Sequence, residues 1–446
     1  MPDSQYQAPE EVLLGQLSST LAGYESSQPF SCSGSFRLSP TSNDSRVTSD
    51  RESETCMRPI IFWCTRAEMK SAAFDSTWAI TRGWENNLEE LAKDCILASL
   101  GCDGQNGQTV GVLSPSSFFT NFKPEDCGIL DAIARELSPG IARSGKESTV
   151  KKWGIVAELH ELKVYSRSSG MSKISVDTPL GRTHFGSLVV VLPTKYEGGQ
   201  LKVTHKGREQ VHLGNGGSLD ATKWVAFYND CEHQVLPVSS GHCVTLIYHL
   251  YVSAHMDSLL QPRLQASSSK GNGLSHSVKD LLASPSFMPN GGILGFHCSF
   301  KYPEKSESTY YYEHYSLALK GIDAVVFTVF RSFGLIVHIK SYGNDRGTQI
   351  QDVRRRCRAS GWEPPLCKKD FERLSQDCYV GNEIFGKATW LNDTPQESPA
   401  AQEQLVDAEL ARWLGNEAEA EWDYCFWALF AMVPAFADRV LDNSGG

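Results

Sequence analysis

The sequence predicts an α+β protein whose core is a β-barrel. Three observations support this prediction. Between Asp177 and Tyr251, long β-branched runs such as FGSLVVVLP are broken by Gly, Pro and Asn, which is the pattern of buried strands. Before this stretch, two segments repeat apolar residues at the i, i+3, i+4 spacing of an amphipathic helix. After it, a C-terminal region contains further helix and strand patterns.

The N-terminal segment, 1–58, is predicted to contain a short helix, a short strand and a flexible loop. EEVLLGQLSSTLAGY (10–24) has helical spacing, and PFSCSGSFRL (29–38) has the composition of a short strand. Ser, Thr and Asp dominate 39–56, which is typical of a flexible loop.

Region 59–153 is predicted to be mainly helical. NNLEELAKDCILASL (86–100) and PEDCGILDAIARELSPG (124–140) both have the spacing of amphipathic helices. In the second, Pro124 and the two acidic residues after it suit a first turn, and Pro139-Gly140 suits a stop. Two such helices ahead of a run of strands are expected to pack on the outer face of a barrel.

The strand patterns are concentrated in 154–255, which is the predicted core. GIVAELHELKVY alternates polar and apolar residues, EGG predicts a turn, and GNGGSLD predicts a loop between strands. A polar linker is predicted for 256–290. The last region, 291–446, is predicted to be α/β, because YSLALKGIDAVVFTVFRSFGLIVHIKSY has the pattern of a helix followed by a strand and KATWL that of another strand.

Composition and charge exclude several classes of partner. A net charge of −10 and a pI near 5.7 argue against a nucleic-acid or anionic-membrane partner. The longest apolar stretches are too short to span a bilayer, and the N-terminus has no pattern of a secretory signal. Thirteen cysteines without a C-x-x-C pair predict reduced thiols in an intracellular, cytoplasmic protein, and disfavour a disulfide framework or a Cys-type zinc site.

Several common catalytic motifs are missing from the sequence. It has no G-x-S-x-G nucleophile elbow and no H-E-x-x-H zinc motif, and GCDGQNGQTV lacks the G-K-[ST] ending of a phosphate-binding loop. Two groups with coordinating chemistry, Asp177 and His233, instead lie at predicted strand edges within an apolar framework. A metal site on a barrel is therefore the first hypothesis that the residues suggest.

Several long segments, in order along the chain, resemble the fungal branch of the prolyl 4-hydroxylase-like 2-oxoglutarate/Fe(II) oxygenases. In the core they are AELHELKVYSRSSG, KISVDTP, HFGSLVVVLPTKYEGGQLKVTHKG and WVAFYNDCEHQVLPVSSGHCVTLIYHLY; beyond it they are GGILGFHCSFKYP, LALKGIDAVVF, KATWLND and LGNEAEA. The resemblance implies a double-stranded β-helix (jelly-roll) core over 154–255, with flanking helices and a C-terminal α/β extension. It also implies two cofactors, Fe(II) and 2-oxoglutarate.

The resemblance also assigns roles to individual residues. This family holds iron with two imidazoles and one carboxylate, leaving other positions for 2-oxoglutarate and O2. His233 in CEHQVLPV corresponds to the distal imidazole, Asp177 in VDTP to the carboxylate, and Tyr165 in KVYS to a position near 2-oxoglutarate. The alternatives are a hydrogen-bonded strand histidine at His233 and an Asx-type turn at Asp177, which precedes Thr178-Pro179.

Two positions depart from the family pattern. Ser175 stands where the family has its other histidine ligand, and Cys243 stands where a basic residue pairs with the distal carboxylate of 2-oxoglutarate. Loss of that charge-assisted pair costs about 1.5–3 kcal/mol or more. The side chain of His242, beside it, is expected to point to the opposite face of the strand from Cys243. Three histidines offer substitute groups, although each is expected to be an ordinary strand-end or surface residue: His184, His205 and His242.

Three functions remain open from the sequence. The first is an oxygenase that oxidises a small molecule or a peptidyl side chain, and the second is a catalytically degenerate jelly-roll that acts as a binding or partner protein. The third is a metal-dependent reaction without 2-oxoglutarate. Convergence of Asp177 and His233 to within about 4–5 Å is the geometry that a shared metal requires. The substrate is expected to be chosen by loops at the barrel mouth, around 170–184 and 206–223, and the oligomeric state stays open.

Overall fold

The structure is a computed structural model that describes residues 9–37, 58–65, 68–74, 84–99, 110–137, 152–167, 172, 174–214, 216–217, 219, 221–255, 272–305, 319–342, 386–393 and 422–439. Over these residues the chain is α+β, as the sequence predicts. The predicted loop at 39–56 lies outside them. None of the helices within these ranges is long and apolar enough to cross a membrane.

The helices and strands have the following bounds. The helices are α1 (Pro9–Ser27), α2 (Trp84–Ser99), α3 (Ile129–Glu136), α5 (Asn272–Ala283) and α6 (Gly321–Ser332). The strands are β1 (Ser31–Arg37), β2 (Ile60–Cys64), β3 (Met69–Ala73), β4 (Gly111–Leu113), β5 (Phe118–Thr120), β6 (Lys152–Ser166), β7 (His184–Val191), β8 (Tyr196–Gly198), β9 (Leu201–His205), β10 (Arg208–His212), β11 (Ala221–Tyr228), β12 (Glu232–Val235), β13 (Val238–His255), β14 (Gly292–Lys305), β15 (Ile336–Tyr342), β16 (Thr389–Trp390) and β17 (Trp422–Val433).

A seven-stranded sheet forms the core of the molecule. Its order is β1-β11-β7-β13-β6-β4, with β8 paired to β13 off this path, and the pairs are antiparallel. All eight residues of β7 are buried, which explains why HFGSLVVV is an unbroken run and does not alternate. The edge strands β1 and β4 come from outside 154–255, so the N-terminal regions complete this sheet. The predicted domain boundaries stay predictions.

A second sheet, of order β10-β9-β12, carries His233 on β12. Side chains of β9 and β12 and side chains of β6, β7 and β13 line the same cavity, so the two sheets face each other across it. Two facing antiparallel sheets are in keeping with the predicted jelly-roll, but the double-stranded β-helix itself stays a prediction.

The two helices predicted before the core are confirmed, with one difference. α3 packs against β6 and β1 and buries Ile129, Leu130 and Ile133. Its predicted first turn at Pro124 is instead a separate 3-10 turn (Pro124–Cys127). Gly128 breaks the two apart because it adopts a left-handed conformation with φ of 65°.

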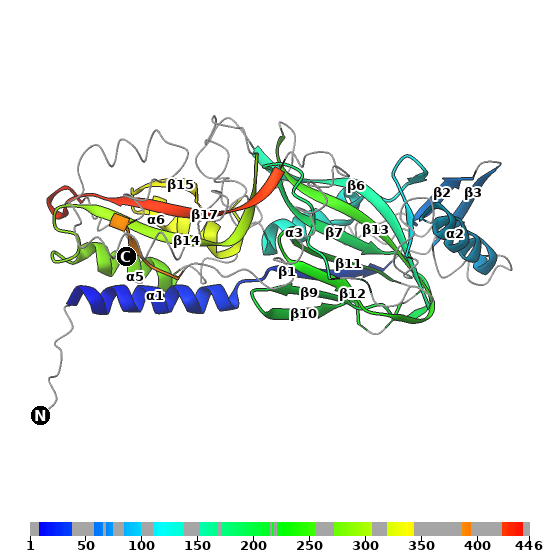
Figure 1. Cartoon of the computed structure of the whole chain (residues 1–446), viewed down its shortest axis with the longest axis horizontal. Coiled ribbons are helices and arrows are strands. Elements are labelled where there is room, and N and C mark those ends of the chain that lie inside the picture. The colour runs from blue at the N-terminus through cyan, green and yellow to red at the C-terminus, as the bar shows by residue number, and fades with distance from the viewer. Residues whose placement is uncertain are drawn as a thin grey trace, which may run out of the picture.

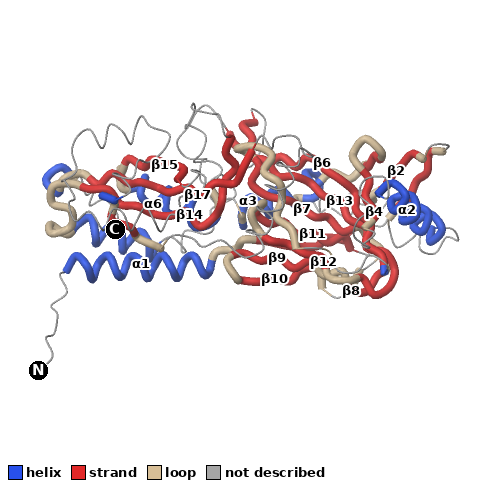
Figure 2. Tube along the Cα trace, viewed as in Figure 1, coloured by secondary structure: helices blue, strands red, loops and turns tan. Residues whose placement is uncertain are grey.

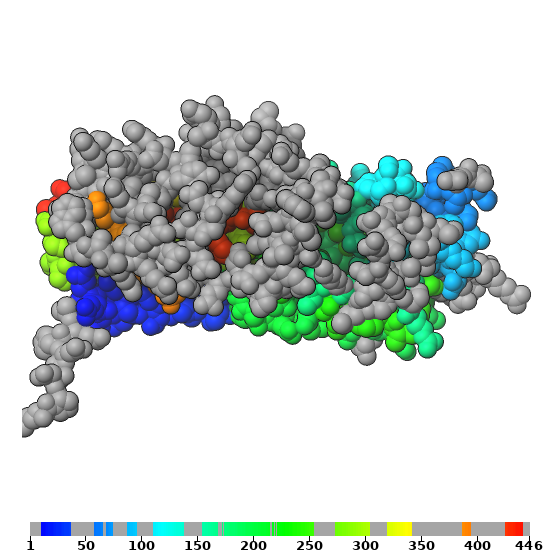
Figure 3. Space-filling model, viewed as in Figure 1, coloured from blue at the N-terminus to red at the C-terminus, as the bar shows by residue number. Residues whose placement is uncertain are grey.

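The C-terminal half contains a sheet of order β15-β17-β14-β16 together with α5 and α6. This sheet and the core sheet lie side by side along the long axis of the molecule (Figure 1). α1 packs against α5 and α6 of the C-terminal half, while β1, the next element, pairs with β11 of the core. The tube view shows α1 along one half and α2 at the opposite end (Figure 2), and in the space-filling view the blue of α1 lies along the left part of the lower edge (Figure 3).

Three predictions need correction. Region 59–153 was expected to be mainly helical, but it also contains the strands β2 to β5, and three of them form a sheet of order β3-β2-β5. The segment 256–290 was expected to be a polar linker, but it contains α5, which buries Leu274, Val278 and Leu281 at helical spacing. Seven cysteines among the described residues are free, whereas Cys127 is disulfide-bonded, so the expectation of reduced thiols is wrong at that position. Sequence spacing gave no sign of this bond because a disulfide depends on a Cα separation that only the fold creates.

Candidate functional site

A cavity of about 400 Å³ lies between the two sheets of the core. All five residues that the sequence singled out line it: Tyr165, Ser175, Asp177, His233 and Cys243. Tyr165 lies on β6, His233 on β12 and Cys243 on β13, and the other two residues lie in the segment that precedes β7. The pairing of these strands brings the five residues together.

Asp177 and His233 face each other at the cavity wall. His233 Nε2 lies 3.8 Å from Asp177 Oδ1, and both side chains are mostly buried. The other carboxylate oxygen, Oδ2, accepts a 2.5 Å hydrogen bond from the Ser187 hydroxyl on β7. Two ligands that are each about 2 Å from one metal ion lie within about 4 Å of each other. This pair therefore has the convergence that a shared ion requires.

Ser175 is held directly opposite His233 by an isolated antiparallel bridge. The backbone N–H of Ser175 donates to the carbonyl of His233 at 3.0 Å, and the N–H of His233 donates back at 2.8 Å. Residues paired in this way carry their side chains on the same face. The Ser175 hydroxyl accordingly lies 3.2 Å from His233 Nε2. A neutral hydroxyl thus lies beside the imidazole nitrogen that faces Asp177.

Only two of these side chains, those of Asp177 and His233, are strong ligands for a divalent metal. One imidazole and one carboxylate are suitable ligands for Fe(II), but a hydroxyl is a poor third. Among the described residues there is no group of three or more His, Cys, Asp and Glu side chains placed to hold a metal. His233 Nδ1 is buried and has no hydrogen-bond partner among the described residues. In metal-bound histidines, the nitrogen that does not bind the metal usually donates a hydrogen bond to a nearby acceptor. The pair can hold a metal, and we expect such a site to be weaker than a three-ligand centre.

Cys243 lies in the apolar part of the cavity wall. It is buried opposite Tyr165 in the β6–β13 ladder. Burial raises the pKa of its thiol to about 12, so the group is neutral at physiological pH. Burial also raises the pKa of the Tyr165 hydroxyl. This pair therefore offers neutral hydrogen-bonding groups and no cation.

The cation of the cavity is Lys163, which the sequence reasoning missed. It lies two residues before Tyr165 on β6 and faces the same side, because side chains alternate along a strand. Burial opposes its charge, but Tyr165 and Glu161 outweigh this effect and raise the pKa of the Lys163 ammonium. Its Nζ lies 2.7 Å from Glu161 Oε1. The alternation in ELKVY was the available signal, since it places 161, 163 and 165 on one face.

Histidines form a further part of the wall. The β6–β13 register shifts between Ile247 and Tyr248, and this bulge allows both His160 and Glu161 to line the cavity. The His160 ring packs against His249 with centroids 4.1 Å apart and the ring planes tilted by 42°. Both His249 nitrogens are buried without a hydrogen-bond partner among the described residues, and burial lowers the pKa of this ring to about 4.

The histidines considered as substitute ligands lie elsewhere. His242 contacts Ser166 and Glu89 outside the cavity, on the face opposite Cys243, as predicted. His205 is stacked on Phe300 of the C-terminal half, with centroids 4.4 Å apart. The third, His184, is buried behind the wall.

Comparisons with known proteins give similar structures but no family. No protein-family model matches the chain, and no curated protein matches it either. Among solved structures, it is similar to a prolyl 4-hydroxylase from Pseudomonas putida, with 16% identity and a TM-score of 0.20 over 37% of this chain and 86% of that one. It is also similar to a viral collagen prolyl hydroxylase from Paramecium Bursaria Chlorella virus-1 (14%, TM-score 0.21, 37% and 90%) and a Trichoplax adhaerens prolyl hydroxylase (9%, TM-score 0.23, 56% and 94%). At these scores, no residue role is transferred from them.

Proposed function

We propose that this chain is a 2-oxoglutarate/Fe(II) oxygenase-like protein that binds a divalent metal and a small organic acid between its two sheets, and oxidises a small molecule or a peptidyl side chain there. The observation that carries the proposal is the 3.8 Å approach of His233 Nε2 to Asp177 Oδ1 in the cavity wall.

The charge of the cavity wall supports a binding order in which the metal ion binds first and the organic acid second. The described residues of this wall include two carboxylates, Glu161 and Asp177, and one ammonium, Lys163, and these three groups together carry one net negative charge. A negative cavity attracts a divalent cation, and the bound cation then makes the cavity net positive and able to accept an organic acid. A carboxylate of that acid has Lys163 as its charge-assisted partner.

The protein groups have separate tasks in this proposal. Asp177 and His233 hold the metal, and the Ser187 hydroxyl orients the carboxylate of Asp177. Lys163 orients the acid, and apolar side chains such as Phe227 exclude water from the cavity. Bound Fe(II) supplies the one-electron and O2 chemistry that side chains lack.

The proposal is tested by anaerobic Fe(II) titration of the full chain, followed by 2-oxoglutarate and O2 with detection of succinate. We expect His233→Ala to weaken iron binding at least about tenfold, equivalent to about 1.4 kcal/mol. The matched control is His242→Ala, which removes a β13 histidine outside the cavity and should bind iron like the wild type. A folded wild type that neither binds iron nor forms succinate would refute the proposal.

A second candidate is a catalytically degenerate binding protein. The position of the Ser175 hydroxyl, 3.2 Å from His233 Nε2, favours it, because a serine stands where a second imidazole would complete the metal site. The double substitution Ser175→His with Cys243→Arg supplies both missing groups. Turnover in the double variant, together with acid binding but no turnover in the wild type, would favour this candidate. Equal iron affinity and turnover in both proteins would exclude it.

A further inference from the structure

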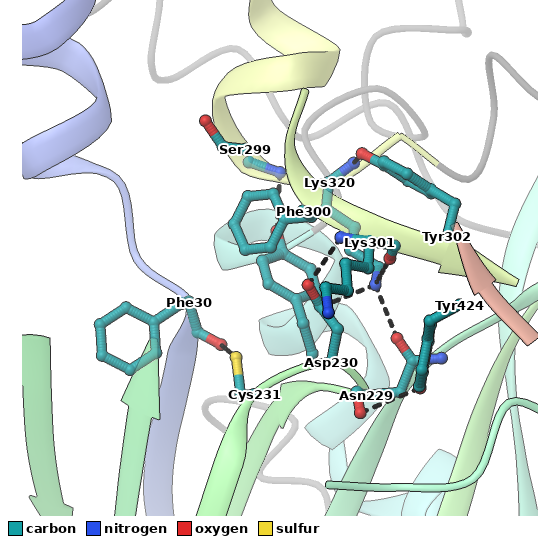
Figure 4. A network of polar contacts seen from close by, with 12 residues as sticks. Phe30, Asn229, Asp230, Cys231, Ser299, Phe300, Lys301, Tyr302, Lys320 and Tyr424 are labelled. Carbon is teal, nitrogen blue, oxygen red and sulfur yellow. Dashed lines mark hydrogen bonds and ion pairs between the residues drawn. The ribbon is translucent and has the colours of Figure 1, made fainter. Parts of the chain in front are cut away.

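The turn between β11 and β12 joins the core to the C-terminal half. It consists of Asn229, Asp230 and Cys231, and β12 carries His233 directly after it. Side chains of the C-terminal half surround this turn: Lys320 before α6 contacts Asn229 and Asp230, and the Tyr424 hydroxyl on β17 donates to the Asn229 carbonyl at 3.0 Å (Figure 4).

Lys320 is the centre of these contacts and is 1% exposed. An ammonium has three N–H donors, and Lys320 Nζ has three acceptors: Asn229 Oδ1 at 2.6 Å, Asp230 Oδ1 at 2.8 Å and the Lys301 carbonyl at 2.9 Å. The second oxygen of Asp230 accepts the backbone N–H of Lys301 at 2.8 Å. The buried charge pair is therefore fully hydrogen-bonded, which is the condition under which such a pair is tolerated.

The contact with Lys320 fixes the orientation of the Asn229 amide. Because an ammonium only donates, the Asn229 atom that faces Nζ is its oxygen. The opposite atom is the NH2 group, which donates to the His184 carbonyl at 2.9 Å and lies 3.2 Å from His184 Nδ1. An NH2 group cannot accept, so Nδ1 is the unprotonated nitrogen. Burial lowers the pKa of His184 to about 3, and the neutral ring therefore carries its proton on Nε2.

His184 connects this network to the cavity. Its ring lies edge-on against His249, with centroids 5.0 Å apart, and His249 lines the cavity. The network thus extends from Lys320 through Asn229 and His184 to a residue of the cavity wall.

We propose that Lys320 is a positioning residue of the cavity: it fixes the Nε2–H form of His184 behind His249, and it anchors the turn that carries His233. The effect of Lys320 on metal binding by Asp177 and His233 rests on the proposed function, whereas its effect on the position of the His184 proton does not. The C-terminal half therefore helps to build the site, although none of its described residues lines the cavity.

The test is nitrogen NMR of the full chain labelled with 15N-histidine, with His184 assigned by a His184→Gln variant. In the wild type we expect His184 in the neutral Nε2–H form. Lys320→Met combined with Asp230→Asn should shift its population toward the Nδ1–H form, because only the hydrogen bond from the Asn229 NH2 group to the His184 carbonyl then opposes rotation of the amide. Both charges are removed together because Lys320→Met alone would leave Asp230 as an uncompensated buried anion.

Tyr424→Phe is the matched control. It removes a hydrogen bond from the same interface but leaves the side-chain amide of Asn229 untouched, so the Nε2–H form should persist. A Co(II) titration should show at least a threefold loss of affinity in the double variant and no change in Tyr424→Phe.

Two NMR results would overturn the proposal. One is a wild-type His184 in the Nδ1–H or charged form, which decides the question even if the double variant does not fold. The other is a folded double variant that keeps the wild-type pattern. A wild type that binds no Co(II) would reject the proposed function, while the NMR result would still decide the role of Lys320.

Discussion

At the residue scale, the cavity brings together a carboxylate, an imidazole and a cation, and the cation lies on a different strand from the one that the resemblance predicts. The resemblance placed the basic residue at Cys243 on β13, but the cationic side chain in the cavity is Lys163 on β6. The two positions are close because Cys243 pairs with Tyr165, two residues from Lys163 on the same face. The cationic side chain thus lies on the strand beside the predicted one.

Lys163→Met should weaken binding of 2-oxoglutarate to the metal-loaded protein about tenfold to hundredfold. Hydrogen bonds to charged groups contribute about 1.5–3 kcal/mol, and the methionine keeps most of the side-chain volume. Calorimetry under anaerobic conditions measures this change. Lys202→Met is the control, since Lys202 pairs with Glu209 on β9 and β10 and does not line the cavity. Equal affinities for the two variants would contradict the assignment of Lys163.

At the element scale, the rim of the cavity depends on the close approach of β8 to the chain before β13. The predicted EGG turn lies here, and Gly198 has φ of 81°. A Cβ on Gly198 would lie 2.2 Å from the carbonyl oxygen of Pro237, so the approach requires glycine in both conformation and space. Gly199, the next residue, lines the cavity.

Gly198→Ala should therefore destabilise the protein by more than about 1–2 kcal/mol, the cost of a left-handed alanine before any clash is counted. Gly23→Ala is the matched comparison, because a Cβ on this exposed residue of α1 meets nothing within 4 Å. It should stabilise the chain by about 0.5–1 kcal/mol through helix propensity. Urea denaturation measures both changes, and shifts of the same sign would contradict this account.

At the scale of the whole molecule, neutral histidines are buried on both sides of the core. His205 packs between the core and Phe300 of the C-terminal half, and burial lowers its pKa to about 4. Burial also lowers the pKa of His184 to about 3 and of His249 to about 4. The unfolded chain would hold these rings near their ordinary pKa of about 6.5. Folding therefore displaces protons from histidines in mildly acidic solution.

Stability should fall as the pH is lowered from about 6.5 to about 4. In this window the unfolded state binds protons that the folded state excludes, so the free energy of unfolding rises with pH. Asp323, whose pKa burial raises to about 7, acts in the opposite direction, but three histidines outweigh one carboxyl. Urea midpoints between about pH 7 and pH 4.5 measure the slope. His205→Gln should reduce it, and an unchanged slope in this variant would show that His205 does not contribute.

Local pattern was enough to predict most elements and the central pair of the site. β-branched runs predicted β7, β11 and β13, since a strand covered on both faces needs apolar residues throughout. Asp177 and His233 were predicted because carboxylate and imidazole groups are common metal ligands, and because the resemblance placed both residues at ligand positions. The predicted linker was the main error among the elements, since the apolar spacing of α5 is diluted by Ser, Gly and Lys.

The sequence by itself determined the α+β class and the positions of the main core strands along the chain, and its resemblance to a family identified Ser175 and Cys243 as departures from that family's pattern. Only the tertiary structure decided that Ser175 lies on the imidazole of His233, that Lys163 supplies the cation, and that Lys320 of the C-terminal half holds the turn before β12. The physical reason is distance. Strand and helix patterns follow from neighbours in the chain, whereas these contacts join residues far apart in sequence, and only the packed fold sets their hydrogen bonds and charges.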